Sequence, residues 1–185
     1  MTDRRGRRVG TMIGGLVAVV ALGAVLAAGL DRPAGTEGTS LPITQHPDRQ
    51  APPLAGTTLS GQEFRLEQYR GQIVVLNVMA SWCSPCRDEV PLIAQAARDF
   101  AGQGVEFVGI AMRDEPESTR ALLAAADAEH LTVVEDPDGV SSIDLGVRGV
   151  PETFVVDRSG MLRLHAFGPI TVDWLDEWVA PMVQS

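Results

Sequence analysis

The chain has 185 residues, of which 45% are hydrophobic and 21% charged, a balance that supports one folded core and excludes wholesale disorder. All fifteen basic residues are arginines, and the net charge of -9 divides unevenly: residues 1–30 carry +3 (4 Arg, 1 Asp) and residues 31–185 carry -12 (11 Arg, 23 acids). The strongly negative charge of residues 31–185 argues against a nucleic-acid-binding surface. The chain has only two cysteines, Cys83 and Cys86, which are too few for a multi-disulfide scaffold or a four-cysteine zinc site.

An uncharged segment, residues 9–30, follows four arginines at the amino terminus. As a helix it would be about 33 Å long, enough to cross a hydrocarbon core of about 30 Å. The basic flank stays in the cytoplasm, so we expect the chain after residue 30 to lie outside. We favour an uncleaved membrane anchor, because the run is longer than the usual signal-peptide core of about 7–15 residues. The alternatives are a cleaved signal peptide, with Ala-Ala-Gly at residues 27–29 as the cleavage site, and a buried soluble helix.

Residues 31–50 are rich in Gly, Pro, Thr and charge and lack an apolar period, which predicts a flexible linker. From residue 51 to residue 185 strand-like and helix-like patterns alternate, so we expect a single α/β domain there. Ser60-Gly61 predicts a hairpin between strands over residues 57–59 and 63–66. The nearly continuous apolar run of residues 73–79 predicts a strand that is covered on both faces.

The rest of the domain continues the alternation of helices and strands. We expect helices over residues 83–100 (with Pro91 inside), 117–129 and 171–183, and strands over residues 105–112, 131–134, 153–156 and 161–166. The last two strands would pair as a hairpin across residues 157–160. The order ββαβαβββα predicts a small sheet with helices on both faces.

The sequence Trp-Cys-Ser-Pro-Cys at residues 82–86 joins the strand over residues 73–79 to the helix that follows it. Two residues between cysteines at the start of a helix let the sulfurs close a disulfide, and the free backbone N–H groups there favour a thiolate on Cys83. Cys86 would lie one turn further in, shielded and able to attack a mixed disulfide. This context predicts a redox-active pair.

Two other interpretations of the cysteine pair are a static disulfide and half of a zinc site. A bridge that closes so short a loop removes little chain entropy, which argues against a purely structural role. His46, His130 and His165 fall in the linker, at a helix end and in a strand, without the spacing of metal ligands. We therefore expect no metal site and interpret each histidine as an ordinary surface or packed side chain.

Two motifs together give the chain a family resemblance. The first is the strand followed by Ala80-Ser81-Trp82-Cys83-x-Pro85-Cys86, with Pro91 in the same helix; the second is the run GVRGVPETFVVD at residues 146–157. With the leading hairpin and the expected anchor, they resemble the extracytoplasmic group of thioredoxin-fold oxidoreductases that contains TlpA, ResA and CcmG/DsbE. The resemblance covers residues 51–185 and implies an α/β thioredoxin-like fold, with a central mixed sheet flanked by helices and an N-terminal β-hairpin extension.

The resemblance also implies roles for residues beside the cysteines. Pro151 would follow a cis peptide bond and face the cysteine pair, and Val150 would offer backbone hydrogen bonds to an extended substrate, beside Trp82. The alternative is a trans proline that opens a strand.

Two acids are further candidates, because cytochrome-maturation members of the family carry glutamates at the positions of Glu89 and Glu152. A half-buried carboxylate near the thiols can take a proton from Cys86, and it would raise the pKa of Cys83. Asn77 stands where thioredoxins carry a titrating aspartate, which makes the two glutamates better candidates for this work. The alternative for Glu89 is a solvated position in the charged run over residues 87–89.

The expected function is that of a membrane-tethered thiol–disulfide oxidoreductase outside the cytoplasm. The resemblance implies reduction of the haem-binding cysteines of apocytochrome c, with electrons from a transmembrane thiol carrier of the CcdA/DsbD kind, contact with the lipid bilayer through residues 9–30, and no cofactor or nucleic acid. The alternatives are a disulfide-forming oxidant, a peroxidase and a copper chaperone. A peroxidase needs a Thr where this chain has Ala80, and copper-binding relatives use a Cys-x-x-x-Cys spacing.

Overall fold

A computed structural model describes residues 43–184 of the chain, so the expected anchor over residues 9–30 and most of the expected linker lie outside the described part. Among the described residues, no helix combines the length and the apolar character that a membrane crossing requires.

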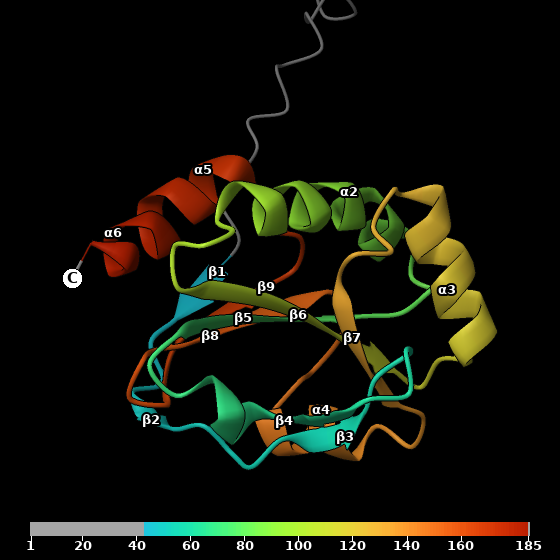
Figure 1. The fold of residues 1–185 in the computed structure, drawn as a ribbon, viewed down its shortest axis with the longest axis horizontal. Coiled ribbons are helices and arrows are strands. Elements are labelled where there is room, and N and C mark those ends of the chain that lie inside the picture. The colour runs from blue at the N-terminus through green and yellow to red at the C-terminus, as the bar shows by residue number, and fades with distance from the viewer. Residues whose placement is uncertain (1–42, 185) are drawn as a thin grey trace, which may run out of the picture. The chain divides into compact units, whose positions relative to one another are not determined.

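A mixed β-sheet forms the middle layer of the fold (Figure 1). In spatial order its strands are β1 (Ile43–Gln45), β9 (Met161–Phe167), β8 (Glu152–Val156), β5 (Ile73–Met79), β6 (Val105–Met112) and β7 (Thr132–Asp136), and β2 (Arg49–Gln50) also pairs with β9. Strands β5, β6 and β7 are parallel to one another, whereas β8 runs antiparallel to both β5 and β9. The predicted thioredoxin-like α/β architecture is confirmed.

Strand β5 is buried along its whole length, as its continuous apolar sequence predicts. Its side chains alternate between two cores: Val75 and Met79 pack with the helices on one face, and Leu76 and Val78 pack on the other face. This alternation between the two faces of the sheet decides which side chains of the neighbouring strands can reach the cysteines.

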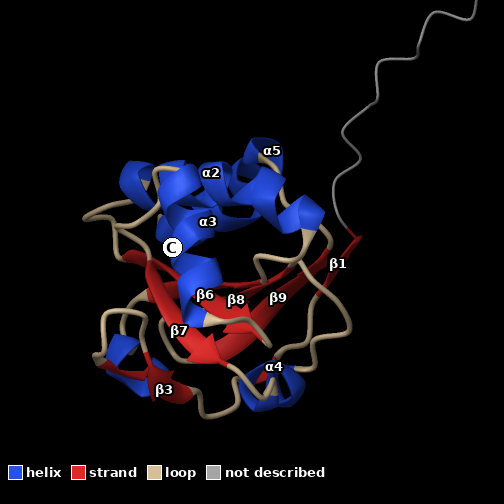
Figure 2. Ribbon diagram, turned by 90° about the vertical axis from the view of Figure 1, so that its right-hand side faces the viewer, coloured by secondary structure: helices blue, strands red, loops and turns tan. Residues whose placement is uncertain are grey.

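One face of the sheet is covered by helices (Figures 1 and 2). They are α2 (Ser84–Asp99), α3 (Pro116–Ala125) and a C-terminal helical segment made of α5 (Val172–Trp174), a π-helical turn (Leu175–Val179) and α6 (Ala180–Val183). The Thr171 hydroxyl accepts a hydrogen bond from the Trp174 backbone N–H at 3.1 Å and so caps the last segment. Helix α3 ends four residues before the predicted end, at Ala125, and Asp127 has a positive φ of 52°.

The other face carries the predicted hairpin, made of β3 (Ala55–Thr57) and β4 (Glu63–Arg65), although β3 lies two residues before the strand expected at residues 57–59. The same face carries a 3-10 turn (Leu66–Tyr69) and α4 (Val140–Leu145) (Figure 2). Helix α4 was not predicted, because six residues are too few to show an apolar period. Its start is fixed by Asp136, whose carboxylate accepts hydrogen bonds from the backbone N–H groups of Ser141 and Ser142, both at 3.0 Å.

The prediction of a flexible linker is wrong for residues 43–50. Strands β1 and β2 lie in this stretch and pair antiparallel with β9. Both are short edge strands with mostly exposed side chains, so backbone hydrogen bonds hold them without any apolar period in the sequence. The folded part therefore begins before residue 51.

Candidate active site

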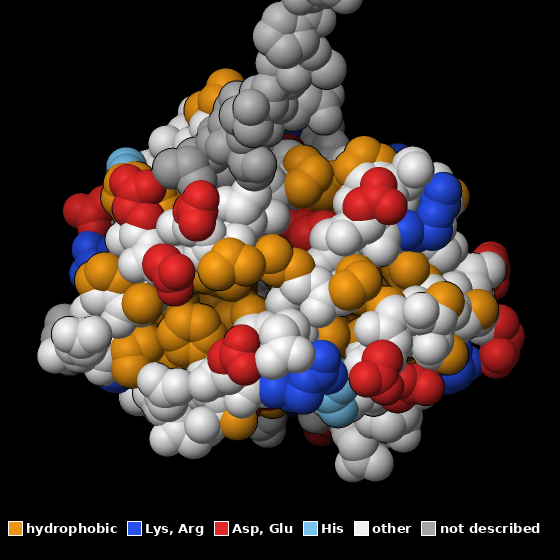
Figure 3. Space-filling model, turned by 90° about the horizontal axis from the view of Figure 1, so that it is seen from above, with side chains coloured by type: hydrophobic (Ala, Val, Ile, Leu, Met, Phe, Trp, Pro, Cys, Tyr) orange, Lys and Arg blue, Asp and Glu red, His pale blue; other side chains and the backbone are white. Residues whose placement is uncertain are grey.

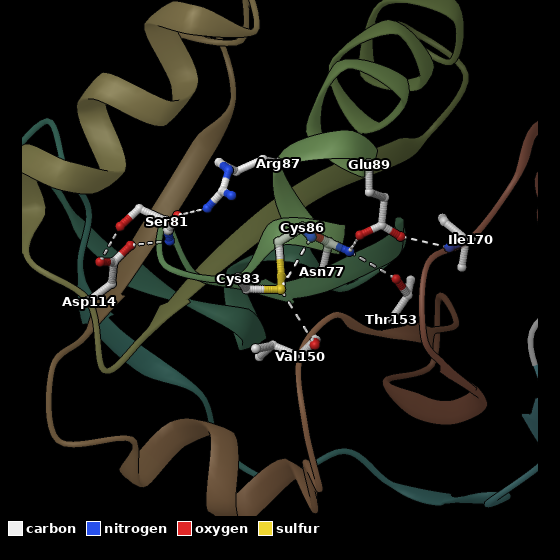
Figure 4. The surroundings of a disulfide bond; sticks show 10 residues. All are labelled: Asn77, Ser81, Cys83, Cys86, Arg87, Glu89, Asp114, Val150, Thr153 and Ile170. Carbon is white, nitrogen blue, oxygen red and sulfur yellow. Dashed lines mark hydrogen bonds between the residues drawn. A yellow bond between two sulfur atoms is a disulfide. The ribbon is translucent and has the colours of Figure 1, made fainter.

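Cys83 and Cys86 form a disulfide where β5 leads into α2 (Figure 4). Cys83 is the residue before the helix, and its Sγ accepts a hydrogen bond from the Cys86 backbone N–H at 3.2 Å. Cys83 is 6% exposed, whereas Cys86 is fully buried. An attacking or attacked sulfur must be reachable, so the geometry gives Cys83 the outer role and Cys86 the inner role.

The loop before β8 lies against the outer sulfur. The Val150–Pro151 peptide is cis, as the resemblance implied, and the Val150 carbonyl oxygen is 3.5 Å from Cys83 Sγ. Trp82, next to Cys83, is 59% exposed, and its indole N–H donates to the Arg113 carbonyl oxygen at 3.1 Å. The structure thus places a backbone segment against the outer sulfur, and the residue next to Cys83 in the chain presents an exposed aromatic side chain.

Asp114 holds the loop that precedes the cysteines. Its carboxylate accepts hydrogen bonds from the Ser81 backbone N–H at 2.6 Å, from the Ser81 hydroxyl at 2.7 Å and from the Thr119 hydroxyl at 2.8 Å. Sequence reasoning missed this residue. The available signal was its position just after β6, since the carboxyl ends of parallel strands meet at one edge of the sheet.

Glu89 lies one turn after Cys86 on α2 and is only 4% exposed, so the solvated interpretation is wrong. Its carboxylate accepts hydrogen bonds from the Ile170 backbone N–H at 2.7 Å and from Asn77 Nδ2 at 3.0 Å. Burial raises the pKa of Glu89 to about 7, against the lowering effect of these two donors. A carboxyl group with this pKa can accept and return a proton near neutral pH.

Asn77 connects Glu89 to the sheet (Figure 4). Its Nδ2 donates both to Glu89 and to the Thr153 hydroxyl at 3.0 Å, whereas its Oδ1 is buried without a hydrogen-bond partner among the described residues. Rotation of the amide by half a turn would present Oδ1 to a protonated Glu89. The Asn77 amide can therefore form a hydrogen bond with Glu89 whether the acid is ionised or protonated.

A cavity of about 260 Å³ is bounded by the start of α2, by Glu89 itself and by Pro169 and Ile170. It gives the buried carboxyl group a neighbouring space through which a proton can exchange with solvent. A larger hollow of about 620 Å³ lies between the second half of α2 and the C-terminal helical segment, and does not involve the cysteines. Viewed from the helical side, hydrophobic side chains gather there among acidic ones (Figure 3).

Glu152 does not face the cysteines. It pairs across the sheet with Val78, whose side chain belongs to the core opposite α2, and alternation places the two side chains on the same face. Its carboxylate accepts hydrogen bonds from the backbone N–H groups of Arg148 at 3.1 Å and Gly149 at 3.0 Å, and lies 2.7 Å from His165 Nε2. The expectation that Glu152 takes a proton from the inner cysteine is therefore corrected: the residue anchors the loop before Pro151.

The three histidines lie apart from the cysteines. His165 is paired with Glu152, the His130 ring lies 3.0 Å from the Ala94 carbonyl oxygen, and the His46 ring centroid lies 5.2 Å from that of Trp178. Within residues 43–184, no three His, Cys, Asp or Glu side chains converge as metal ligands.

The fold and the site together define a thioredoxin-fold protein built around a Cys-x-x-Cys disulfide. Residues 47–165 match the AhpC/TSA family. The chain belongs to this family.

The relatives of the chain agree with its motifs. It is 35% identical over 113 residues to the thiol:disulfide interchange protein HelX of Rhodobacter capsulatus, across 61% of this chain and 62% of HelX. It is 30% identical over 140 residues to the thiol:disulfide interchange protein CycY of Rhizobium leguminosarum, across 76% of this chain and 74% of CycY. The match thus spans less than two thirds of HelX, but about three quarters of CycY.

The fold also matches solved structures. The crystal structure of a thiol:disulfide interchange protein of the thioredoxin family from Chlorobium tepidum superposes with a TM-score of 0.65 at 27% identity, over 75% of this chain and 99% of that one. The chain is also 36% identical over 113 residues to the thiol:disulfide interchange protein DsbE of Allochromatium vinosum, across 61% of each chain. The resemblance to the CcmG/DsbE group that the motifs predict is therefore confirmed.

Proposed function

We propose that this protein is a thiol–disulfide oxidoreductase in which Cys83 and Cys86 cycle between a disulfide and two thiols. The observation that carries the proposal is the asymmetry of the pair: an outer sulfur beside the Val150 carbonyl and a fully buried inner sulfur one helical turn away. The relatives' names, thiol:disulfide interchange proteins, support the same chemistry.

In the reducing direction, the Cys83 thiolate attacks one sulfur of a substrate disulfide and releases the other as a thiolate. The Cys86 thiolate then attacks Cys83 Sγ, which breaks the mixed disulfide, releases the second substrate thiol and closes the Cys83–Cys86 bond. Two electrons pass from the pair to the substrate. The N–H group of Cys86 and the start of α2 stabilise the Cys83 thiolate, and Glu89 takes the proton from Cys86.

The direction we propose is reduction of disulfides in exported proteins, with the haem-binding cysteines of apocytochrome c as the substrate. Residues 84 and 85, between the cysteines, are Ser and Pro, so no histidine stabilises the Cys83 thiolate from within the motif, and the nearby buried acid is Glu89. A weakly stabilised thiolate favours the disulfide form and a low reduction potential, nearer the thioredoxin value of about -270 mV than the oxidant value of about -120 mV.

A glutathione redox titration of the described domain tests the direction. A potential near about -270 mV supports reduction, and a potential above about -150 mV assigns the protein to the disulfide-forming oxidants instead.

The proposed location is outside the cytoplasmic membrane, held by residues 9–30, with a transmembrane thiol carrier of the CcdA/DsbD kind as the electron source. The support is the run of four arginines before an uncharged segment. Protease added to intact spheroplasts should digest the domain that contains Cys83. A domain that resists protease until the membrane is permeabilised would refute the location.

A further inference from the structure

A buried His–Glu pair lies beneath the loop that borders the outer sulfur. The His165 and Glu152 side chains are 8% and 4% exposed, and Nε2 of the histidine is 2.7 Å from Oε2 of the carboxylate. Both side chains lie on the face of the sheet opposite α2, so neither can exchange a proton directly with a cysteine. The proposed exchange between Cys83, Cys86 and a substrate disulfide uses neither side chain.

Aromatic rings fix the orientation of the histidine. The His165 ring stacks on Phe154 with centroids 4.0 Å apart, and the Phe167 ring lies at 4.1 Å on β9. Burial lowers the pKa of His165, and the charges of Arg148 and Arg49 lower it further, against the opposing effect of Glu152. A neutral imidazole beside a carboxylate carries its proton on Nε2 and donates it to Glu152.

The other oxygen of Glu152 reaches the loop. Oε1 accepts the backbone N–H groups of Arg148 and Gly149, and the next residue, Val150, presents its carbonyl oxygen 3.5 Å from Cys83 Sγ. The Arg148 guanidinium lies over the Phe167 ring, 5.2 Å from its centroid, on the strand that also carries His165. A continuous set of contacts thus runs from β9 through the carboxylate to the backbone beside the reactive sulfur.

We propose that His165 is a positioning residue for disulfide exchange, which fixes the Glu152 carboxylate so that residues 148–150 hold the shape that receives a substrate backbone beside Cys83. The inference rests on the proposed function only where it predicts an effect of His165 on the kinetics of disulfide exchange. The positioning itself concerns the loop and can be measured without any substrate.

The experiment compares His165→Leu, which removes the donor, with His165→Gln, whose side-chain amide can still donate to Glu152. Val156→Ala is the matched control, because it truncates a buried side chain on the same face of β8 without touching the loop. Amide hydrogen exchange of Arg148 and Gly149 is the first measurement. We expect exchange to be faster on the order of tenfold in His165→Leu, and close to the wild-type rate in His165→Gln and Val156→Ala.

Kinetics supply the second measurement, with a disulfide-containing decapeptide and with hydroxyethyl disulfide, which has no peptide backbone. His165→Leu should raise KM for the peptide about tenfold at nearly constant kcat and leave the rate with hydroxyethyl disulfide unchanged. In a Glu152→Gln background, His165→Leu should have little further effect, because both residues act through the same contact.

Unchanged amide exchange in His165→Leu, or exchange that Gln fails to restore, overturns the inference whatever the activity. Equal losses with both substrates also overturn it, since they indicate general destabilisation, which Val156→Ala would reproduce. A wild-type protein that exchanges with neither disulfide refutes the proposed function, and the amide measurement then still decides whether His165 positions the loop.

Discussion

Replacement of Glu89 by glutamine should change the pH dependence of stability, because the acid is buried with a pKa raised from 4.5 to about 7. Between these two values the folded protein binds a proton that the unfolded chain has already released. The free energy of unfolding therefore falls as pH rises through this window. At about 1.36 kcal/mol per pKa unit, the loss attributable to Glu89 amounts to about 3 kcal/mol above pH 7.

Glutamine resembles the protonated form of Glu89 and does not ionise. Its carbonyl oxygen can accept the Ile170 N–H, and its amide can donate to the Asn77 Oδ1 that lacks a partner in the described structure. We expect Glu89→Gln to match the wild type near pH 4 and to be more stable by up to about 3 kcal/mol at pH 8. Urea denaturation of both oxidised proteins between pH 4 and pH 8 measures this difference.

Asp88→Asn is the matched control, since it removes the charge of the neighbouring acid, which is exposed. The control should show no comparable growth of the stability difference with pH. If the difference between Glu89→Gln and the wild type is the same at pH 4 and pH 8, Glu89 does not titrate near neutrality in the folded protein, and its assignment as proton acceptor fails with it.

Two further predictions concern the cysteines and the loop before them. Cys83→Ser should abolish disulfide exchange, and Cys86→Ser should trap a mixed disulfide on Cys83, because the inner sulfur is buried and resolves the intermediate. Non-reducing electrophoresis checks both variants. A mixed disulfide trapped on Cys86 in the Cys83→Ser variant would reverse the roles of the two cysteines. Asp114→Ala should destabilise the protein by about 2 kcal/mol in urea denaturation, since it removes the acceptor for the Ser81 backbone and hydroxyl, and a loss below about 0.5 kcal/mol would contradict the proposed anchoring.

The sequence alone determined the chemistry of the outer site. A continuous apolar run, then Trp-Cys-Ser-Pro-Cys, then a helix predicts a buried strand that delivers two cysteines to a helix start, because each of these features depends on neighbours in the chain. The hairpin over β3 and β4 could also be predicted, since a Ser-Gly turn between two strands is a local signal. The short strands β1 and β2 could not, because only the edge of β9 provides their hydrogen bonds.

Only the tertiary structure decided what the acids do. All five residues of β8 are buried, so alternating exposure gives no sign of which face Glu152 occupies; the pairing of Glu152 with Val78 places it away from the cysteines. Glu89 stands in a charged run that looks solvated, yet Ile170, 81 residues later, closes over it. A carboxylate takes its role from the donors and the solvent around it, and here those donors come from distant segments that only the folded chain brings together.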